Sequence, residues 1–269
     1  MFGAFYGDVI GSYYELHCTK AYDFTFEKDS SFTDDSVLTA AVCRAILENP
    51  ADITRFQLRE RAKQYAVQYR QFYTYYPHAG YGQMFVKWAK DSYAKNNHSY
   101  GNGAAMRVIP IGYAYETMEQ TLLQAKASAL STHNNREAIL GAQAVAAAVF
   151  LARHGEGKDG IRSYISKSFK YDLSISLASI RESHVFDSRT SYSVPPAIIA
   201  FLEAHDYESA VRNAVSLGGD ADTQACIAGG IAEAFYQEIP AHIQRFCDGR
   251  IDGTIKKTVR EFSEKYIKK

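Results

Sequence analysis

Apolar positions recur along most of the chain at the three- to four-residue spacing of amphipathic helices. One of the predicted helices starts at Ala104 and is expected to bend or restart at Pro110. The alternation typical of β-strands is almost absent, so the pattern predicts an all-α fold, a single compact orthogonal helical domain over residues 1–269. The other predicted helices cover residues 1–14, 33–47, 52–75, 83–94, 117–130, 136–153, 160–170, 173–183, 193–205, 207–216, 221–237, 241–247 and 254–267.

The first predicted helix carries Gly3, Gly7 and Gly11 at four-residue spacing. On a helix these glycines form one smooth face that allows a neighbouring element to approach closely. A membrane dimer motif is a poor interpretation because Asp8 lies in the middle of the segment. The chain shows no basic-then-apolar leader and no apolar run near the roughly 18 residues of a membrane span. We therefore expect a cytoplasmic protein that does not bind membranes.

The composition narrows the class of protein further. Hydrophobic residues make up 46% of the 269 positions, which is enough for a buried core. Thirty basic residues balance 30 acidic ones, and this argues against a general nucleic-acid or anionic-membrane surface. The four cysteines are scattered without a CxxC pair, so they indicate reduced thiols rather than a zinc site or a disulfide framework.

Two acidic motifs each place two carboxylates and a hydroxyl at a predicted helix start. Either motif alone could simply cap a helix, but close carboxylates repel each other, and a helix dipole offsets only about 0.3–1 kcal/mol of that. Together the motifs supply six hard oxygen ligands, which suit Mg²⁺, Mn²⁺ or Ca²⁺ better than zinc. Two metals that share a bridging carboxylate would fit four aspartates in one place. The six residues are Thr33, Asp34, Asp35, Asp220, Asp222 and Thr223.

A glycine-containing segment between predicted helices is a candidate anion site. Residues 99–107 read Ser-Tyr-Gly-Asn-Gly-Ala-Ala-Met-Arg, and they offer backbone amides next to a helix N-terminus, an arrangement that binds phosphate. The turn with Gly80 and Gly82 is a weaker signal of the same kind. Taken alone, Glu15 would be a surface charge and His133 a solvated or hydrogen-bonded histidine.

Together, five motifs in this order resemble the ADP-ribosylglycohydrolase family, which includes dinitrogenase-reductase-activating glycohydrolase and the vertebrate ADP-ribosyl-acceptor hydrolases. The resemblance implies an all-α fold, a binuclear Mg²⁺ (or Mn²⁺) centre and hydrolysis of an ADP-ribosyl bond. It covers nearly the whole chain, and its motifs are Gly7-Asp8-Val9-Ile10-Gly11-Ser12-Tyr13-Tyr14-Glu15, Thr33-Asp34-Asp35-Ser36, Gly101-Asn102-Gly103-Ala104-Ala105-Met106-Arg107, Thr132-His133 and Gly218-Gly219-Asp220-Ala221-Asp222-Thr223.

The resemblance also implies roles for single residues. Thr33, Asp34, Asp35, Asp220, Asp222 and Thr223 would be the metal ligands, and Glu15, Asp34 and Asp35 the catalytic carboxylates. The motifs look most like those of the serine-specific, poly(ADP-ribose)-cleaving branch, in which the glutamate matching Glu15 is the key acid or base. The substrate would be bound by Gly80, Gly82, Ser99, Tyr100, Gly101, Asn102, Gly103 and His133. In this set Tyr100 would stack on adenine, and His133 would contact the diphosphate–ribose region.

Two departures from that branch stand out. Its glycine pattern is longer than Gly80-Tyr81-Gly82-Gln83-Met84, and the difference at Met84 bears on the contacts around the substrate ribose. Ser36 replaces the more usual threonine and keeps the hydroxyl.

The resemblance implies a Mg²⁺-dependent hydrolase that removes ADP-ribose from modified proteins, with serine-linked ADP-ribose and poly(ADP-ribose) favoured. Such a bond breaks through an oxocarbenium-like transition state, for which two divalent ions could orient the ribose diol and lower the pKa of bound water. One alternative is an arginine-specific N-glycosidic hydrolase, in which Asp34 or Asp35 would carry more of the chemistry. A non-catalytic ADP-ribose-binding protein and a metal-dependent hydrolase of another small nucleotide are further alternatives. We expect a monomer whose partner is an ADP-ribosylated protein or an ADP-ribose-containing small molecule, without direct nucleic-acid binding.

Overall fold

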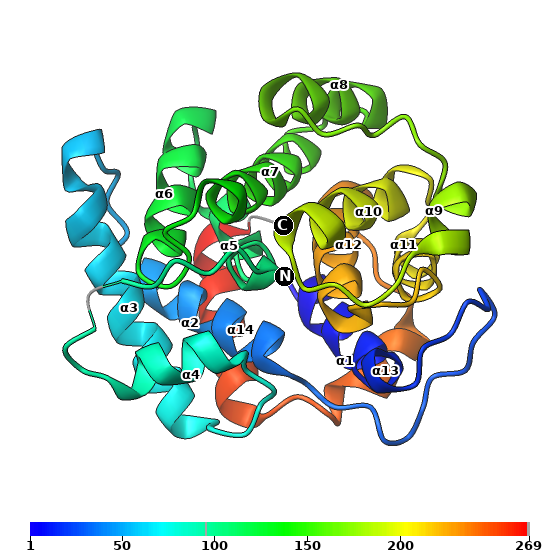
Figure 1. Cartoon of the computed structure of the whole chain (residues 1–269), viewed down its shortest axis with the longest axis horizontal. Coiled ribbons are helices and arrows are strands. Elements are labelled where there is room, and N and C mark those ends of the chain that lie inside the picture. Colours follow the sequence, from blue (N-terminus) through cyan, green and yellow to red (C-terminus); the bar gives the residue numbers. More distant parts are fainter. Residues whose placement is uncertain (95, 268–269) are drawn as a thin grey trace.

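The computed structural model describes residues 1–94 and 96–267. Over these ranges the chain forms fourteen α-helices and two short 3-10 helices, and it contains no strand. The helices surround one buried apolar core and cross one another at varied, often steep angles (Figure 1). These observations confirm the all-α prediction.

The helices are α1 (Gly3–Leu16), α2 (Asp34–Glu48), η1 (Arg55–Gln57), α3 (Leu58–Tyr75), α4 (Gln83–Lys90), η2 (Asn102–Ala104), α5 (Ile109–Ala114), α6 (Met118–Leu130), α7 (Arg136–Arg153), α8 (Lys158–Phe169), α9 (Leu177–Ser183), α10 (Thr190–Leu202), α11 (Tyr207–Val215), α12 (Ala221–Tyr236), α13 (Ala241–Asp248) and α14 (Gly253–Tyr266).

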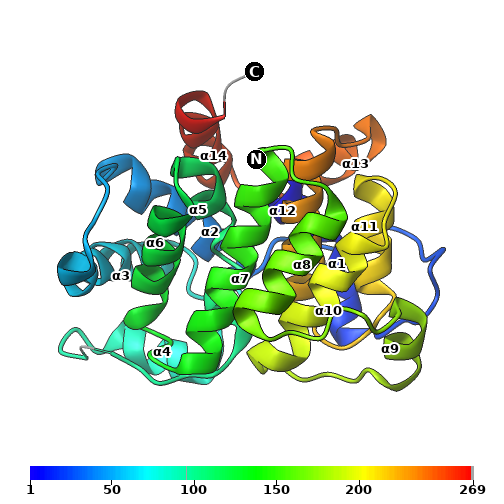
Figure 2. The ribbon, with the colours of Figure 1, turned by 90° about the horizontal axis from the view of Figure 1, so that it is seen from above.

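Helix α1 lies directly against α12, although the two are separated by most of the sequence (Figures 1 and 2). The glycine face of α1 makes this approach possible. A Cβ added at Gly7 would overlap the carbonyl of Ala225, and one at Gly11 would lie 2.5 Å from the carbonyl oxygen of Ala221. Contact this close between two helix backbones excludes any larger side chain. The predicted role of the glycine face is therefore confirmed.

Helix α2 begins where the sequence predicts it, with Thr33 as the N-cap. The Thr33 hydroxyl accepts a hydrogen bond from the Asp35 backbone amide at 3.3 Å. Such a cap satisfies one of the free amides of the first turn, and it leaves both aspartates of the motif at the helix entrance.

The predicted helix start at Ala104 is wrong. Residues 102–104 form the tight turn η2, because the amides of Ala105 and Met106 both donate to the Asn102 carbonyl. The α-helix starts only at Ile109, with Pro110 in its first turn, where a missing amide hydrogen costs nothing.

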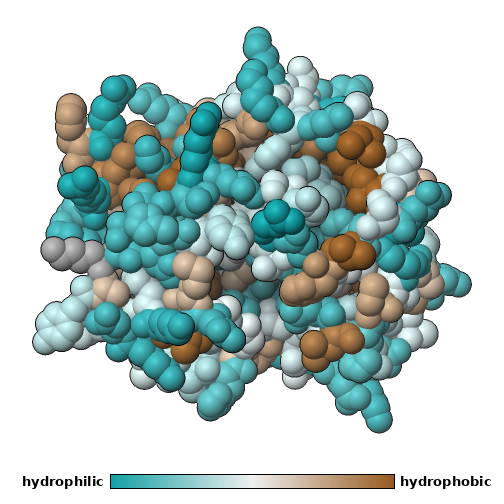
Figure 3. Space-filling model, viewed as in Figure 1, coloured by the Kyte–Doolittle hydropathy of each residue, from teal (hydrophilic) through white to brown (hydrophobic). Residues whose placement is uncertain are grey.

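Other predicted boundaries also shift, among them those of α10, which spans Thr190–Leu202 rather than residues 193–205. Helix α4 ends at Lys90 rather than at residue 94, α3 begins only after η1, and α9 begins at Leu177 behind the N-cap Ser176. Among the described helices, none has the length and apolar content needed to cross a bilayer. On the face shown in Figure 3, hydrophilic side chains predominate, and apolar surface gathers at the upper left, where Figure 1 has α3 and α6, and in separate patches on the right.

Candidate metal centre and substrate cavity

A cavity of about 400 Å³ opens where α1, α2 and α12 meet the segments before α4 and around η2. All of the site residues predicted from the sequence line it. They are Glu15, Thr33, Asp34, Asp35, Gly80, Gly82, Ser99, Tyr100, Gly101, Asn102, Gly103, His133, Asp220, Asp222 and Thr223. The fold thus brings together motifs that lie as far apart in the sequence as Glu15 and Thr223.

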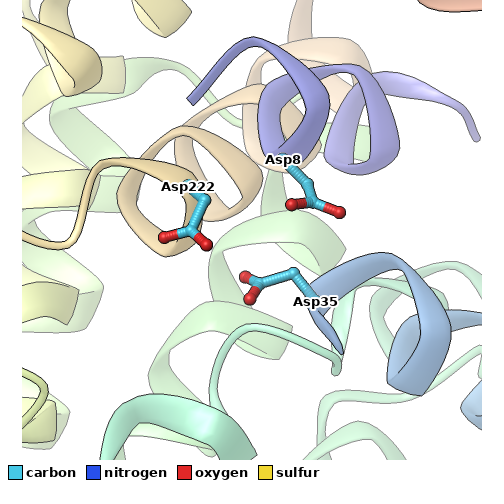
Figure 4. A group of neighbouring side chains, drawn as sticks. All are labelled: Asp8, Asp35 and Asp222. Atoms are coloured by element: carbon cyan, nitrogen blue, oxygen red, sulfur yellow. The ribbon is translucent and has the colours of Figure 1, made fainter. Parts of the chain in front are cut away.

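Carboxylates from three helices converge at this cavity. Oxygen atoms of Asp8 on α1, Asp35 on α2 and Asp222 on α12 all lie within 4.8 Å of one another (Figure 4). A second group joins Asp222 to Asp220 and to Glu15, again within 4.8 Å. Acidic groups spaced in this way can share hard cations.

Asp8 was not among the predicted site residues. It is fully buried, and its carboxylate accepts hydrogen bonds from the backbone amide and hydroxyl of Thr33, at 2.9 and 2.7 Å. It also accepts from the amide of Ser36, at 3.1 Å, and from its hydroxyl. Asp8 therefore ties α1 to the entrance of α2, and it is the hydrogen-bond partner of the hydroxyl that Ser36 offers in place of threonine. Two sequence signals could have pointed to Asp8: it lies between two close-packing glycines, and it belongs to the first of the five motifs.

Asp35 carries an unsatisfied oxygen. Its Oδ2 accepts a hydrogen bond from the Thr223 hydroxyl at 3.3 Å, whereas its buried Oδ1 has no hydrogen-bond partner in the described part of the chain. Burial of a carboxylate oxygen without a partner is costly, and a divalent cation would remove that cost. The residues present therefore fit a metal ion.

The electrostatics of the cluster agree with this fit. Burial, followed by the charges of Asp8 and Asp34, raises the pKa of Asp35 well above its usual range. Burial and the neighbouring Asp220 do the same to the pKa of Asp222. Without a counter-ion the cluster favours protonation, and a cation among these carboxylates would favour their charged forms.

Asp220 occupies the N-cap position of α12, but its side chain does not cap the helix. Its Oδ2 instead accepts a hydrogen bond from the side-chain amide of Asn102 at 2.8 Å. This contact links the entrance of α12 to the segment around η2. The preceding glycines, Gly218 and Gly219, have φ of 72° and 73°, a conformation that other residues rarely adopt, and they turn the chain into the helix.

Asp34 is placed differently from the other aspartates. It is partly exposed, and within the described chain it belongs to neither carboxylate group. It faces the segment before α4, where a Cβ added at Gly80 would lie 3.5 Å from its Oδ1. Gly80 has φ of 98°, so the turn that passes Asp34 requires glycine.

The glycine segment before η2 is already tied to the protein through its backbone. The amide of Gly101 donates to the Ser99 hydroxyl at 3.1 Å, and the amide of Asn102 donates to the Ser188 carbonyl at 2.8 Å. These two amides are paired within the protein. The segment is therefore held rigidly at the cavity wall, with the side chain of Asn102 on Asp220.

His133 presents a defined donor to the cavity. A guanidinium can only donate, so Arg107 Nη2 donates to Thr132 Oγ1 at 2.6 Å. The Thr132 hydroxyl hydrogen then has His133 Nδ1, 2.8 Å away, as its acceptor among the described residues. This order of donors leaves the hydrogen of His133 on Nε2, beside Gly103. Burial and the Arg107 charge hold the pKa of His133 well below its usual range, so its ring is neutral at pH 7.

Large side chains surround the mouth of the cavity. Tyr100 and Phe186 both line it and remain 53% and 57% exposed, and Met84 lines it as well. Phe186 and Arg107 were not predicted as site residues. Phe186 lies between two helices in a segment without helical spacing, and nothing in the sequence marks it as part of the site.

Comparison with known proteins places this arrangement in a family. The family model described as ADP-ribosylglycohydrolase matches residues 1–268. The chain is 28% identical to ADP-ribosylhydrolase ARH3 of Homo sapiens, over 92% of this chain and 87% of that protein. It is 25% identical to ADP-ribosylhydrolase ARH3 of Xenopus tropicalis, over 94% and 91% of the two chains.

A solved structure described as an ADP-ribosylglycohydrolase-related protein complex shares the fold. It matches with a TM-score of 0.67 and 22% identity, over 97% of this chain and 95% of that chain. Since the family model spans nearly the full length and the predicted motifs meet at one cavity, the chain belongs to the ADP-ribosylglycohydrolase family.

Proposed function

We propose that the protein is a Mg²⁺-dependent hydrolase that removes ADP-ribose from modified proteins by cleaving the O-glycosidic bond to serine. The observation that carries this proposal is the buried acidic cluster of α1, α2 and α12, with its unpaired Asp35 oxygen, at a cavity that also holds Glu15. Family membership and relatives that bear the name ADP-ribosylhydrolase support the reaction class.

Two divalent cations would be held by Thr33, Asp34, Asp35, Asp220, Asp222 and Thr223, a donor set made entirely of oxygen. When bound, the ions would supply charge for orienting the ribose diol and for lowering the pKa of a water molecule. The partial exposure of Asp34, beside the Gly80 turn, supports a role for it at the point where such ions would meet substrate. Mn²⁺ offers the same ligand preferences and is expected to substitute.

Glu15 is the proposed proton-transfer residue. It lies near the end of α1, it is partly exposed to the cavity, and its carboxylate lies within 4.8 Å of those of Asp220 and Asp222. Burial, followed by the charges of Asp220 and Asp8, raises the pKa of Glu15. A carboxyl with a raised pKa can donate a proton to a leaving oxygen and recover one from water.

The rest of the cavity would hold the ADP-ribosyl group. The Nε2 hydrogen of His133 would donate to a diphosphate oxygen, and the exposed ring of Tyr100 offers a face for adenine. Gly82 has open space around it, with no atom within 4 Å of an added Cβ. Gly80 and Gly82 therefore leave room for the ribose near Asp34.

The test is release of ADP-ribose from a serine-linked and an arginine-linked peptide, each with Mg²⁺, with Mn²⁺ and with EDTA. We expect metal-dependent release from the serine peptide alone. Release from the arginine peptide alone would replace the proposal with N-glycosidic hydrolysis. Binding of ADP-ribose without release from either peptide would replace it with a binding role.

A further inference from the structure

The molecule has a second hollow that the proposed function does not use. It runs over α6 between α3 and α7, which flank α6 in Figure 2, and its volume is about 1430 Å³. None of the predicted site residues lines it. Ser131 and Asn134 line this groove, whereas Thr132 and His133 line the substrate cavity, so one stretch of backbone forms the wall between the two.

The floor of the groove is aliphatic. Leu58, Ala62 and Ala66 recur at four-residue spacing along one face of α3, and Leu130, Ile139 and Leu140 continue the surface on α6 and α7. Apolar surface is visible there in Figure 3, with hydrophilic side chains around it. At the edge, Val67 and Phe56 are 60% and 91% exposed. Apolar patches rimmed by polar groups are typical of interaction surfaces.

The rim of the groove is basic. No aspartate or glutamate lines it in the described part of the chain, although acidic and basic residues are equal in number over the whole sequence. Lys63 is paired with Glu60, and Arg70 donates to backbone carbonyls. The cationic side chains without a hydrogen bond or ion pair to the described residues are Arg55, Arg59, Lys126 and Arg136.

We propose that this groove binds an acidic, amphipathic helical segment of a partner protein. A helix about 10 Å across can lay an apolar face on the aliphatic floor while its carboxylates meet the basic rim. A flat bilayer cannot enter a concave groove. The aromatic residues of the groove, Phe56 and Tyr93, are both 91% exposed, and the aliphatic floor offers nucleic-acid bases no face on which to stack. The docked segment would lie next to the substrate cavity, across the wall formed by residues 131–134.

The test is binding of labelled synthetic peptides of about 18 residues, measured by fluorescence anisotropy on the full chain. One peptide carries leucines on one helical face and glutamates on the other, and the matched peptide carries lysines in place of the glutamates. The groove variant combines Arg59→Glu and Lys126→Glu. The control variant combines Lys257→Glu and Arg260→Glu, which makes the same charge change at exposed positions of α14. Unfolding temperatures of both variants confirm that they fold.

We expect the glutamate peptide to bind the wild-type chain and the lysine peptide to bind it at least tenfold more weakly. The groove variant should weaken binding of the glutamate peptide about tenfold, because two attractions become repulsions, while the control variant changes it less than about twofold. Val67→Ser should weaken binding without any charge change. Equal binding of both peptides, or no binding, would overturn the proposal. So would groove-dependent binding of duplex DNA or anionic vesicles in place of the peptide.

Discussion

Among the described residues that line the cavity, Glu15 is the single carboxylate that combines partial exposure with membership of a carboxylate group. Glu15→Gln keeps the size and hydrogen-bonding capacity of the side chain but cannot transfer a proton. We expect kcat for release of ADP-ribose from the serine peptide to fall by about 10²–10⁴, the range attributed to general acid–base catalysis. The affinity for ADP-ribose, measured by calorimetry, should stay within a few-fold. Full activity in this variant would remove Glu15 from the mechanism.

His133 is oriented by a chain of two hydrogen bonds, and the middle link can be removed alone. Thr132→Val has nearly the same shape but no hydroxyl, so the hydrogen bond to His133 Nδ1 is lost. We expect the ring nitrogen signals in ¹⁵N NMR to change from pure Nε2–H to a mixture, and ADP-ribose affinity to fall about tenfold. Thr132→Ser, which keeps the hydroxyl, should restore both. An unchanged NMR tautomer in Thr132→Val would contradict this hydrogen-bond order.

At the scale of helices, the contact between α1 and α12 decides where Asp8 and Asp222 stand. A methyl group at Gly7 overlaps a backbone carbonyl that cannot rotate away. We expect Gly7→Ala to lower the free energy of unfolding by about 1–3 kcal/mol and to abolish metal-dependent activity, because the helices must separate. Gly253→Ala is the matched control, since an added Cβ there meets no atom within 4 Å. Equal stability of the two variants in urea unfolding would show that α1 and α12 tolerate separation.

The helices and the residues at their ends differ in how far the sequence alone predicts them. Helical spacing is a local property, so the helices were found where their periodicity is strong. Asp220 and Asp222 are separated by the single residue Ala221, and their crowding could be inferred without a structure. Asp8 could not be found in this way, because its hydrogen-bond donors, Thr33 and Ser36, lie 25 and 28 positions away and reach it only through packing of α1 on α2.

Two further differences between the prediction and the structure also arise from tertiary contacts rather than from local sequence. The segment after Ala104 has helical composition, but it begins with a tight turn in which the Asn102 carbonyl accepts hydrogen bonds from two backbone amides. The α-helix therefore begins only at Ile109, with Pro110 in its first turn. Phe186 reaches the cavity mouth from an irregular segment, whose course depends on contacts such as that of Ser188 with the Asn102 amide. Neither arrangement leaves a periodic signal in the sequence.

Over the whole molecule, a formal net charge of zero conceals a strong separation of charge. Acidic groups are concentrated and buried where α1, α2 and α12 meet, and basic groups line the groove over α6. The net charge of the chain therefore gives no information about either region, because each depends on which charged residues the fold brings together. The acidic cluster also makes the stability of the metal-free chain depend on pH.

In the folded chain the pKa values of Asp35 and Asp222 are raised well above those of an unfolded carboxyl. The stability that they contribute is therefore fully present below the unfolded pKa of about 4, and it is lost as the pH rises through their folded pKa values. In EDTA we expect the unfolding temperature to fall as the pH rises above about 4, because from there on the folded chain holds protons that the unfolded chain has lost. Saturating Mg²⁺ binds the charged carboxylates and should restore stability at the higher pH, by about 2.7 kcal/mol at 100 times Kd. Differential scanning fluorimetry measures both effects.

An unfolding temperature that rises with pH in EDTA, or that Mg²⁺ leaves unchanged, would mean that these carboxylates are not a cation site.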